Sequence, residues 1–214
     1  FDVLERDGVA AVPDLVGGLT GEDARVLATE ILTGDAEDAS RLPRALVEAA
    51  DGPDDLITAA GGDLALVLRR MGVVDPGRGL VICDAAGALL RRKPVAGFPL
   101  PVMGAGCPLW PVYTALGQPG RPLTVVVETP DGAGWRVHAI AQAVAVAGFG
   151  AAPVIRATML LTRTHSGGAG APVGPGCRVC PRIECPARRE PSVLSTRPDM
   201  LDMVDLTGDT LPRS

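Results

Sequence analysis

The chain has 214 residues, of which 47% are hydrophobic, with a mean hydropathy of +0.25 and a formal net charge of −5. This apolar content is enough for a buried core and excludes an intrinsically disordered chain, and the length predicts one large domain or two small ones. No run of 18 or more residues is both apolar and uncharged, so we expect no transmembrane helix and no membrane partner. The most apolar region, 139–155, contains two glycines and a proline and predicts a buried strand with a turn.

The first residues, FDVLERDGVA, contain early acids and lack both a basic segment and an apolar segment, so they do not resemble a signal peptide. They also lack an initiator Met, which favours a fragment of a longer chain. We therefore expect a cytoplasmic protein whose thiols stay reduced. The five cysteines are an odd number and three of them fall within nine residues, which favours metal binding over disulfides.

Charge is distributed unevenly along the chain. Residues 1–75 carry 16 acidic and 6 basic side chains, a net charge of −10, whereas residues 76–214 carry a net charge of +5. The acidic part would repel a phosphate backbone, so it gives no reason to expect nucleic-acid binding. The basic part is able to hold an anionic ligand, although both parts also fit ordinary solvated surfaces.

Three helices are predicted in the acidic first third, because apolar residues recur there at helical spacing. Their predicted ranges are 19–32, with Thr20 as the cap, 39–50, and 54–71, the last interrupted at the paired glycines 61–62. Gly34 and Gly72 are predicted to end the first and the third helix. None of them carries a metal motif, a phosphate loop or a helix-turn-helix pattern, so we expect a packing layer.

The middle of the chain changes to short apolar runs that are separated by turn signals. Strands are predicted over 80–84, 88–91, 123–129, 135–146 and 154–164, with a short helix over 108–116. We therefore predict an α+β fold in which a helical N-terminal part is followed by a mainly antiparallel sheet of the GAF or PAS type. The predicted units are an acidic helical region, a sheet sensor domain, a cysteine-rich loop and a tail, over 1–75, 76–166, 167–191 and 192–214.

Most candidate metal ligands lie in the segment that holds Cys177, Cys180 and Cys185. Glycine and proline there favour a tight loop. Three thiolates need a fourth ligand to complete either a zinc site or a 4Fe–4S cluster. Cys107, which also lies in a loop next to a proline, is the best remote candidate, and His165 is the alternative.

The other cysteine and histidine are expected to be structural. Cys83 lies within an apolar strand pattern and is predicted to be a small buried hydrophobe, and His138 lies on a predicted strand.

Residues 176–191, GCRVCPRIECPARREP, resemble the C-terminal signature of the short-chain fatty acyl transcriptional regulators. Further stretches are similar to motifs of this family in the same order. They are the hairpin 84–87 with 91–93, the GCPLWPVY stretch 106–113, the PDG turn 130–132 and the GFGAAP stretch 148–153. The resemblance covers about residues 80–191 and rests on several separate motifs.

The resemblance implies an acyl-CoA-sensing C-terminal region and, in propionate regulators of this kind, a 4Fe–4S cluster. It implies that Cys107, Cys177, Cys180 and Cys185 are the four ligands, and it favours iron–sulfur over zinc. Full-length members carry an N-terminal helix-turn-helix domain. Since this chain shows no such motif, DNA binding is expected only through a domain outside it.

A CoA ligand needs cations for its phosphates and an apolar slot for its acyl group. Basic candidates for the phosphates are Arg91, Arg92, Lys93 and Arg121, and aromatic candidates for the slot are Trp110, Tyr113 and Phe98. The alternative interpretation is that the aromatic residues fill the core and that the basic trio is a solvated hairpin end.

The leading hypothesis is a non-catalytic sensor domain of a cytoplasmic transcriptional regulator, which binds a 4Fe–4S cluster and a short-chain acyl-CoA or CoA, with self-association as a further hypothesis. The alternative is a structural zinc-binding interaction module whose acidic helices contact a partner. An enzyme is the weakest reading, because the sequence shows no Ser/His/Asp or paired-carboxylate pattern.

Overall fold

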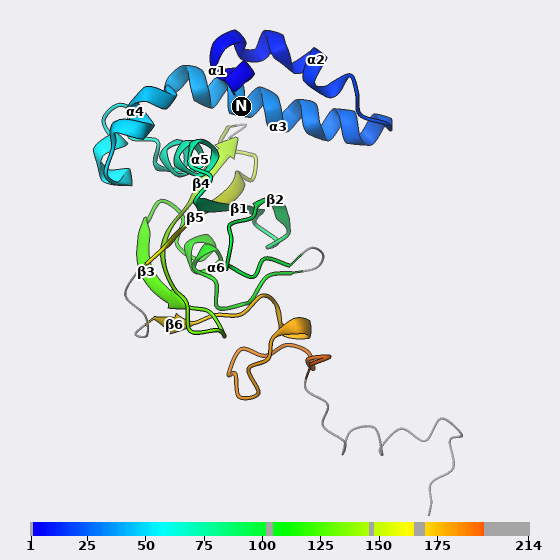
Figure 1. The fold of residues 1–214 in the computed structure, drawn as a ribbon, viewed down its shortest axis with the longest axis vertical. Coiled ribbons are helices and arrows are strands. Elements are labelled where there is room, and N and C mark those ends of the chain that lie inside the picture. Colours follow the sequence, from blue (N-terminus) through cyan, green and yellow to red (C-terminus); the bar gives the residue numbers. More distant parts are fainter. Residues whose placement is uncertain (1, 102–104, 146–147, 165–169, 195–214) are drawn as a thin grey trace, which may run out of the picture.

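The computed structural model describes residues 2–101, 105–145, 148–164 and 170–194. Figure 1 shows three tiers, with helices above a curved sheet and the cysteine-rich segment below it. No helix within these ranges is long and apolar enough to cross a membrane.

The first tier is built on the long helix α3 (Glu22–Arg41). Helices α1 (Asp2–Asp7) and α2 (Val12–Val16), joined by the 3-10 turn η1 (Gly8–Ala11), pack against it through a small apolar cluster. The sequence pattern did not indicate these short helices.

Helix α3 was predicted to end at Gly34, but it continues through this residue to Arg41. Glycine in a helix interior costs only about 1 kcal/mol. The following turn makes contacts that offset this cost, because the buried side chains of Asp35 and Asp38 pair with arginines of the sheet and of the next helical layer.

The predicted second helix, over 39–50, is divided between α3 and α4 (Arg44–Ala49). Pro43 causes this division, because proline disfavours helical backbone at the residue before it, and Leu42 indeed leaves the helical region.

The third predicted helix is broken at the paired glycines, as expected, since both adopt the left-handed backbone, with φ of 63° and 83°. The 3-10 turn η2 (Pro53–Leu56) precedes the break and α5 (Leu64–Val74) follows it. Gly72 does not stop α5, contrary to prediction. A Cβ there would lie 2.9 Å from the Cβ of Leu80, so the glycine lets the helix approach the sheet closely.

The sheet has six strands in the order β2-β1-β5-β4-β3-β6. Their bounds are β1 (Arg78–Asp84), β2 (Leu89–Lys93), β3 (Leu123–Glu128), β4 (Gly134–Ala145), β5 (Val154–Arg163) and β6 (Ala171–Pro172). All pairs are antiparallel except β3 with β6. The predicted α+β fold with a mainly antiparallel sheet is therefore confirmed.

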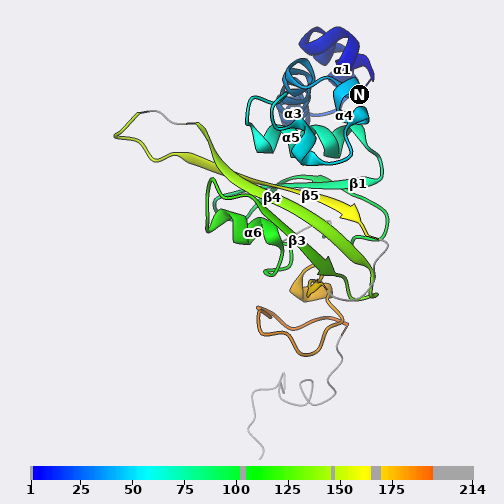
Figure 2. The same cartoon turned by 90° about the vertical axis from the view of Figure 1, so that its left-hand side faces the viewer.

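Both faces of the sheet are covered, as the side view in Figure 2 shows. Helix α5 packs on one face, where Leu66 and Met71 meet Ile140 and Leu160. Helix α6 (Pro111–Leu116) covers the other face, in a cluster that contains both tryptophans. Its first turn starts three residues later than predicted, because residues 107–110 form a separate turn. Helix α5 and the sheet thus share a hydrophobic core, whereas α1, α2 and α3 form a separate apolar cluster.

Candidate functional site

The cysteine-rich segment is attached to the far end of the sheet from the helices (Figure 1). Strand β6 pairs with β3, and the N–H of Val173 donates to the carbonyl of Glu128. Residues 173–177 are buried, so Cys177 is held against the core at the start of the 3-10 turn η3 (Cys177–Val179).

Three of the four predicted metal ligands lie in this region. Burial raises the pKa of the Cys107 thiol; backbone N–H groups at Leu109 and Gly174 oppose this effect, and the adjacent thiols of Cys180 and Cys177 add to it. Arg189 joins the two loops, because its N–H donates to the Sγ of Cys177 and its Nη2 donates to the carbonyl of Gly106. The fold therefore places Cys107 in the same region as Cys177 and Cys180, although it lies 70 residues before Cys177 in the sequence, and all three are at most 7% exposed.

The backbone around these thiols leaves room for the sulfurs and donates to them. A Cβ at Gly174 would lie 2.6 Å from the Sγ of Cys180, and one at Gly176 would lie 2.9 Å from the carbonyl oxygen of Ala105. The N–H of Arg189 donates to the Sγ of Cys177 at 3.4 Å. Such N–H···S contacts favour the thiolate form, which is the form that binds a metal.

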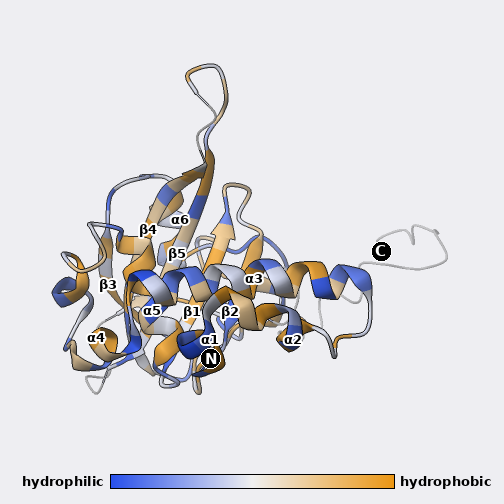
Figure 3. Cartoon of the chain, turned by 90° about the horizontal axis from the view of Figure 1, so that it is seen from above, coloured by the Kyte–Doolittle hydropathy of each residue, from blue (hydrophilic) through white to orange (hydrophobic). Residues whose placement is uncertain are grey.

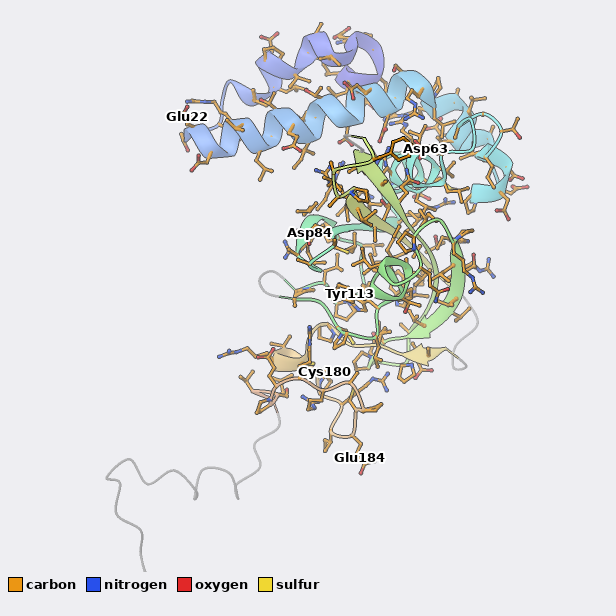
Figure 4. The ribbon with its side chains drawn as sticks, turned by 180° about the vertical axis from the view of Figure 1, so that it is seen from behind. Glu22, Asp63, Asp84, Tyr113, Cys180 and Glu184 are labelled. Atoms are coloured by element: carbon orange, nitrogen blue, oxygen red, sulfur yellow. The ribbon has the colours of Figure 1, made fainter. Side chains whose placement is uncertain are left out.

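Cys185, the fourth predicted ligand, is half-buried further along the same segment. Figure 4 shows the neighbouring Glu184 at the outer end of this loop, whereas Cys180 lies nearer the sheet. Within the described part of the chain, no three His, Cys, Asp or Glu side chains are arranged closely enough to hold a metal ion.

Arginines hold the loop in place by donating to backbone carbonyls. Arg189 donates to the carbonyl of Gly106, Arg188 to those of Cys177 and Arg182, and Arg182 to that of Glu128. These side chains therefore cross-link the cysteine-rich segment to the Cys107 loop and to β3, besides placing positive charge near the thiols.

The remaining cysteine and histidines are placed as follows. Cys83 is fully buried in β1, as predicted, where burial and the charge of Asp84 raise its pKa to about 11. His138 lies half-buried on β4, where burial lowers its pKa. His165 lies outside the described residues.

The aromatic candidates form one cluster. The ring of Phe98 lies 5.8 Å from that of Trp110 and 5.3 Å from that of Trp135, and Tyr113 stacks on Trp110 at 6.5 Å. Trp110 is fully buried and its Nε1 donates to the carbonyl of Gly174 at 2.9 Å. Through this hydrogen bond, the aromatic cluster in the core holds the start of the cysteine-rich segment in place.

The basic candidates do not converge on one point. The guanidinium of Arg91 pairs with Asp35 of α3, and the Nζ of Lys93 donates to two backbone carbonyls. Arg92 follows Arg91 on β2 and so faces the other side of the sheet. Arg121 lies after α6 and donates to Gln118.

Sequence reasoning missed a cleft of about 730 Å³ between α3 and the sheet. Its polar lining includes the ion pairs Asp35–Arg91, Asp38–Arg69 and Glu30–Arg156. The volume lies within the ~300–1,000 Å³ typical of small-molecule sites. The three-residue spacing of Asp35 and Asp38 was the available signal, since it places both acids on one helix face.

Comparisons with known proteins agree with this architecture. Residues 77–199 match the sequence profile of the family described as "Short-chain fatty acyl coenzyme A regulator, C-terminal". The HTH-type transcriptional regulator RamB of Mycobacterium tuberculosis is 32% identical over 126 residues, which cover 51% of this chain and 27% of that protein. The Propionyl-CoA carboxylase regulator of Cereibacter sphaeroides is 30% identical, over 88% of this chain and 46% of that protein.

A solved structure of a Mycobacterium tuberculosis transcriptional regulator shares the fold, with a TM-score of 0.69 at 22% identity, over 88% of this chain and 68% of that one. The chain spans less than half the length of these two curated relatives. The family profile nevertheless covers more than half of the chain. The chain therefore belongs to the short-chain fatty acyl coenzyme A regulators, and residues 77–199 correspond to their C-terminal domain.

Proposed function

We propose that this chain is the ligand- and redox-sensing part of a transcriptional regulator, without catalytic activity of its own. It holds a 4Fe–4S cluster through Cys107, Cys177, Cys180 and Cys185. The observation that carries the proposal is that Cys107 lies in the same buried region as Cys177 and Cys180, which come from a distant part of the sequence.

The residues around the thiols are suited to such a cluster. Iron–sulfur clusters are held by four Cys thiolates, and hydrogen bonds to the sulfurs and solvent exposure tune them. The buried thiols, the N–H of Arg189 aimed at Cys177, and the surrounding arginines supply these features. Cys185 follows on the same loop and completes the donor set. Four thiolates also suit zinc, which remains the alternative metal.

The second part of the proposal is that the chain binds a short-chain acyl-CoA. Its support is the family, whose description names fatty acyl coenzyme A, and a relative whose name refers to propionyl-CoA carboxylase. DNA would be read by a helix-turn-helix domain outside this chain, as the name of RamB suggests for that relative.

Metal analysis after anaerobic purification and reconstitution tests the cluster. We expect a brown protein with about four iron and four sulfide per chain. Replacing Cys107 with Ser should abolish most of the iron, while Cys83→Ala, which alters a buried cysteine on β1, should keep it. A colourless protein with stoichiometric zinc would overturn the cluster and support the structural zinc module.

A further inference from the structure

The hairpin that joins β4 to β5 carries an exposed aromatic side chain. Figures 2 and 3 show this hairpin extending from the sheet beyond the helices. Its tip, residues 148–153, has the sequence GFGAAP, and Phe149 is 115% exposed. The sequence around the tip, from 139 to 155, contains no charged residue. A protruding, uncharged and apolar segment of this kind is suited to contact with another apolar surface.

The cleft between α3 and the sheet begins at the base of the same hairpin, because Val144 of β4 lines it. Four acidic and four basic side chains belong to its described lining, so their net charge is zero. Each of the four arginines already forms an ion pair with a carboxylate of the chain. The cleft therefore suits an uncharged occupant better than an anion.

Apolar side chains that remain exposed lie beside these ion pairs in the cleft. Leu27 of α3, Leu90 of β2 and Val144 are 56%, 42% and 45% exposed. A volume of about 730 Å³ holds a phenylalanine ring together with the small residues that flank it. Covering these side chains with an apolar segment would remove hydrophobic surface from water, which favours association.

A second copy of this chain carries the segment that fits. Phe149 follows Val144 by five residues, so at most about 18 Å of extended chain separates the exposed ring from the cleft of its own chain. When two copies are related by a two-fold axis near Val144, the hairpin tip of each reaches the cleft of the other. Every contact then occurs twice and the assembly closes as a dimer.

We propose that two copies of this chain exchange hairpin tips, so that Phe149 of each copy contacts Leu27 and Leu90 in the cleft of the other. The cleft is then completed by a residue from the second copy. This inference does not depend on the proposed cluster or on acyl-CoA binding.

The first test measures dimerisation of the full chain by sedimentation equilibrium. Phe149→Asp removes an apolar contact that occurs twice in each dimer, so it should weaken dimerisation by about a hundredfold or more. Leu27→Asp should weaken it from the side of the cleft. Leu46→Asp is the matched control, because Leu46 is 47% exposed on α4 and does not line the cleft. A chain that stays monomeric, or a dimer that survives Phe149→Asp, would overturn the proposal.

Mixing the two variants distinguishes exchange into the cleft from contact between the two tips. A pair that combines Phe149→Asp with Leu27→Asp keeps one complete contact, because the first variant retains its cleft and the second its hairpin tip. The mixed pair should therefore associate more tightly than either variant does alone. If only Phe149→Asp breaks the dimer and Leu27→Asp leaves it unchanged, the tips do not dock in the cleft and the proposal is wrong.

Photo-crosslinking locates the contact without disrupting it. Benzoylphenylalanine at position 149, in a mixture of chains with ordinary and heavy nitrogen, should link to peptides of α3 or β2 that carry the other isotope. Crosslinks that form only within one chain, or only to other elements, would contradict the exchange.

Discussion

Gly106 lets the loop before Cys107 pass against the ring of Trp110. A Cβ at this position would overlap the indole, whose own Nε1 holds the carbonyl of Gly174. One missing methyl group thus allows the core aromatic ring, the Cys107 loop and the cysteine-rich segment to meet.

Gly106→Ala should therefore lower the free energy of unfolding by about 1–3 kcal/mol, as overpacking does, and should reduce iron content. Gly117→Ala is the control, because a Cβ there makes only an ordinary contact, 3.5 Å from the carbonyl oxygen of Thr114. Denaturant unfolding and iron analysis check both. Equal stability of the two variants would contradict the close contact.

Cys83 differs chemically from the other cysteines. With a pKa near 11, its thiol is almost entirely protonated at pH 8, and its burial in β1 excludes reagents. We expect mass spectrometry of the native, metal-free chain to show iodoacetamide on Cys185 well before Cys83. Modification of Cys83 should require unfolding, and comparable labelling of both in the folded chain would contradict its placement.

At the scale of elements, Asp63 joins three parts of the fold. Its carboxylate accepts from the Leu66 N–H at 3.0 Å, which caps α5, and from Gln142 of β4 at 3.1 Å, and it pairs with Arg41 of α3. Burial raises its pKa, but these bonds and the charge of Arg69 outweigh burial and hold the pKa below its ordinary 3.8.

Asp63→Ala should cost about 1–2 kcal/mol of stability at pH 7, mainly through the lost helix cap. A folded pKa below the unfolded value means that the stabilisation is present above pH 3.8 and is lost as the pH falls through the lowered pKa. Urea unfolding at several pH values should show the difference between the two chains shrinking in acid. If the difference in free energy of unfolding stays constant with pH, the carboxylate charge does not cause it.

At the scale of the whole molecule, α5 belongs to the core of the sheet domain. Its apolar face, including Leu66 and Met71, covers Ile140 and Leu160. Each buried side chain of this size contributes about 1.5–3 kcal/mol, and the usual net stability of a domain is only about 5–15 kcal/mol.

A fragment that starts at residue 76 should therefore lose cooperative folding, whereas one that starts at residue 53 keeps α5 and should retain it. Circular dichroism on heating distinguishes the two. A cooperative transition in the shorter fragment would show that the sheet is stable without its helical cover.

The strands and the antiparallel arrangement could be predicted from the sequence, because period-two patterning and turn residues such as Asp131-Gly132 are local signals. Helix ends were less predictable, since the ion pairs of Asp35 and Asp38 extend α3 beyond Gly34, and Gly72 lets α5 approach Leu80 closely. Cys107 could be predicted as the best remote ligand because it lies in a loop next to a proline, and the family resemblance implied the same four cysteines.

By itself, the sequence determined the fold class, the family motifs and the residues available for a metal, because these follow from local patterns and composition. Only the tertiary structure decided that Arg91 pairs with Asp35 of α3 and that Arg189 joins the Cys107 loop to Cys177. These contacts join residues 56 and 70 positions apart. No local pattern specifies such contacts, because they depend on how packed layers place side chains that are remote in the chain.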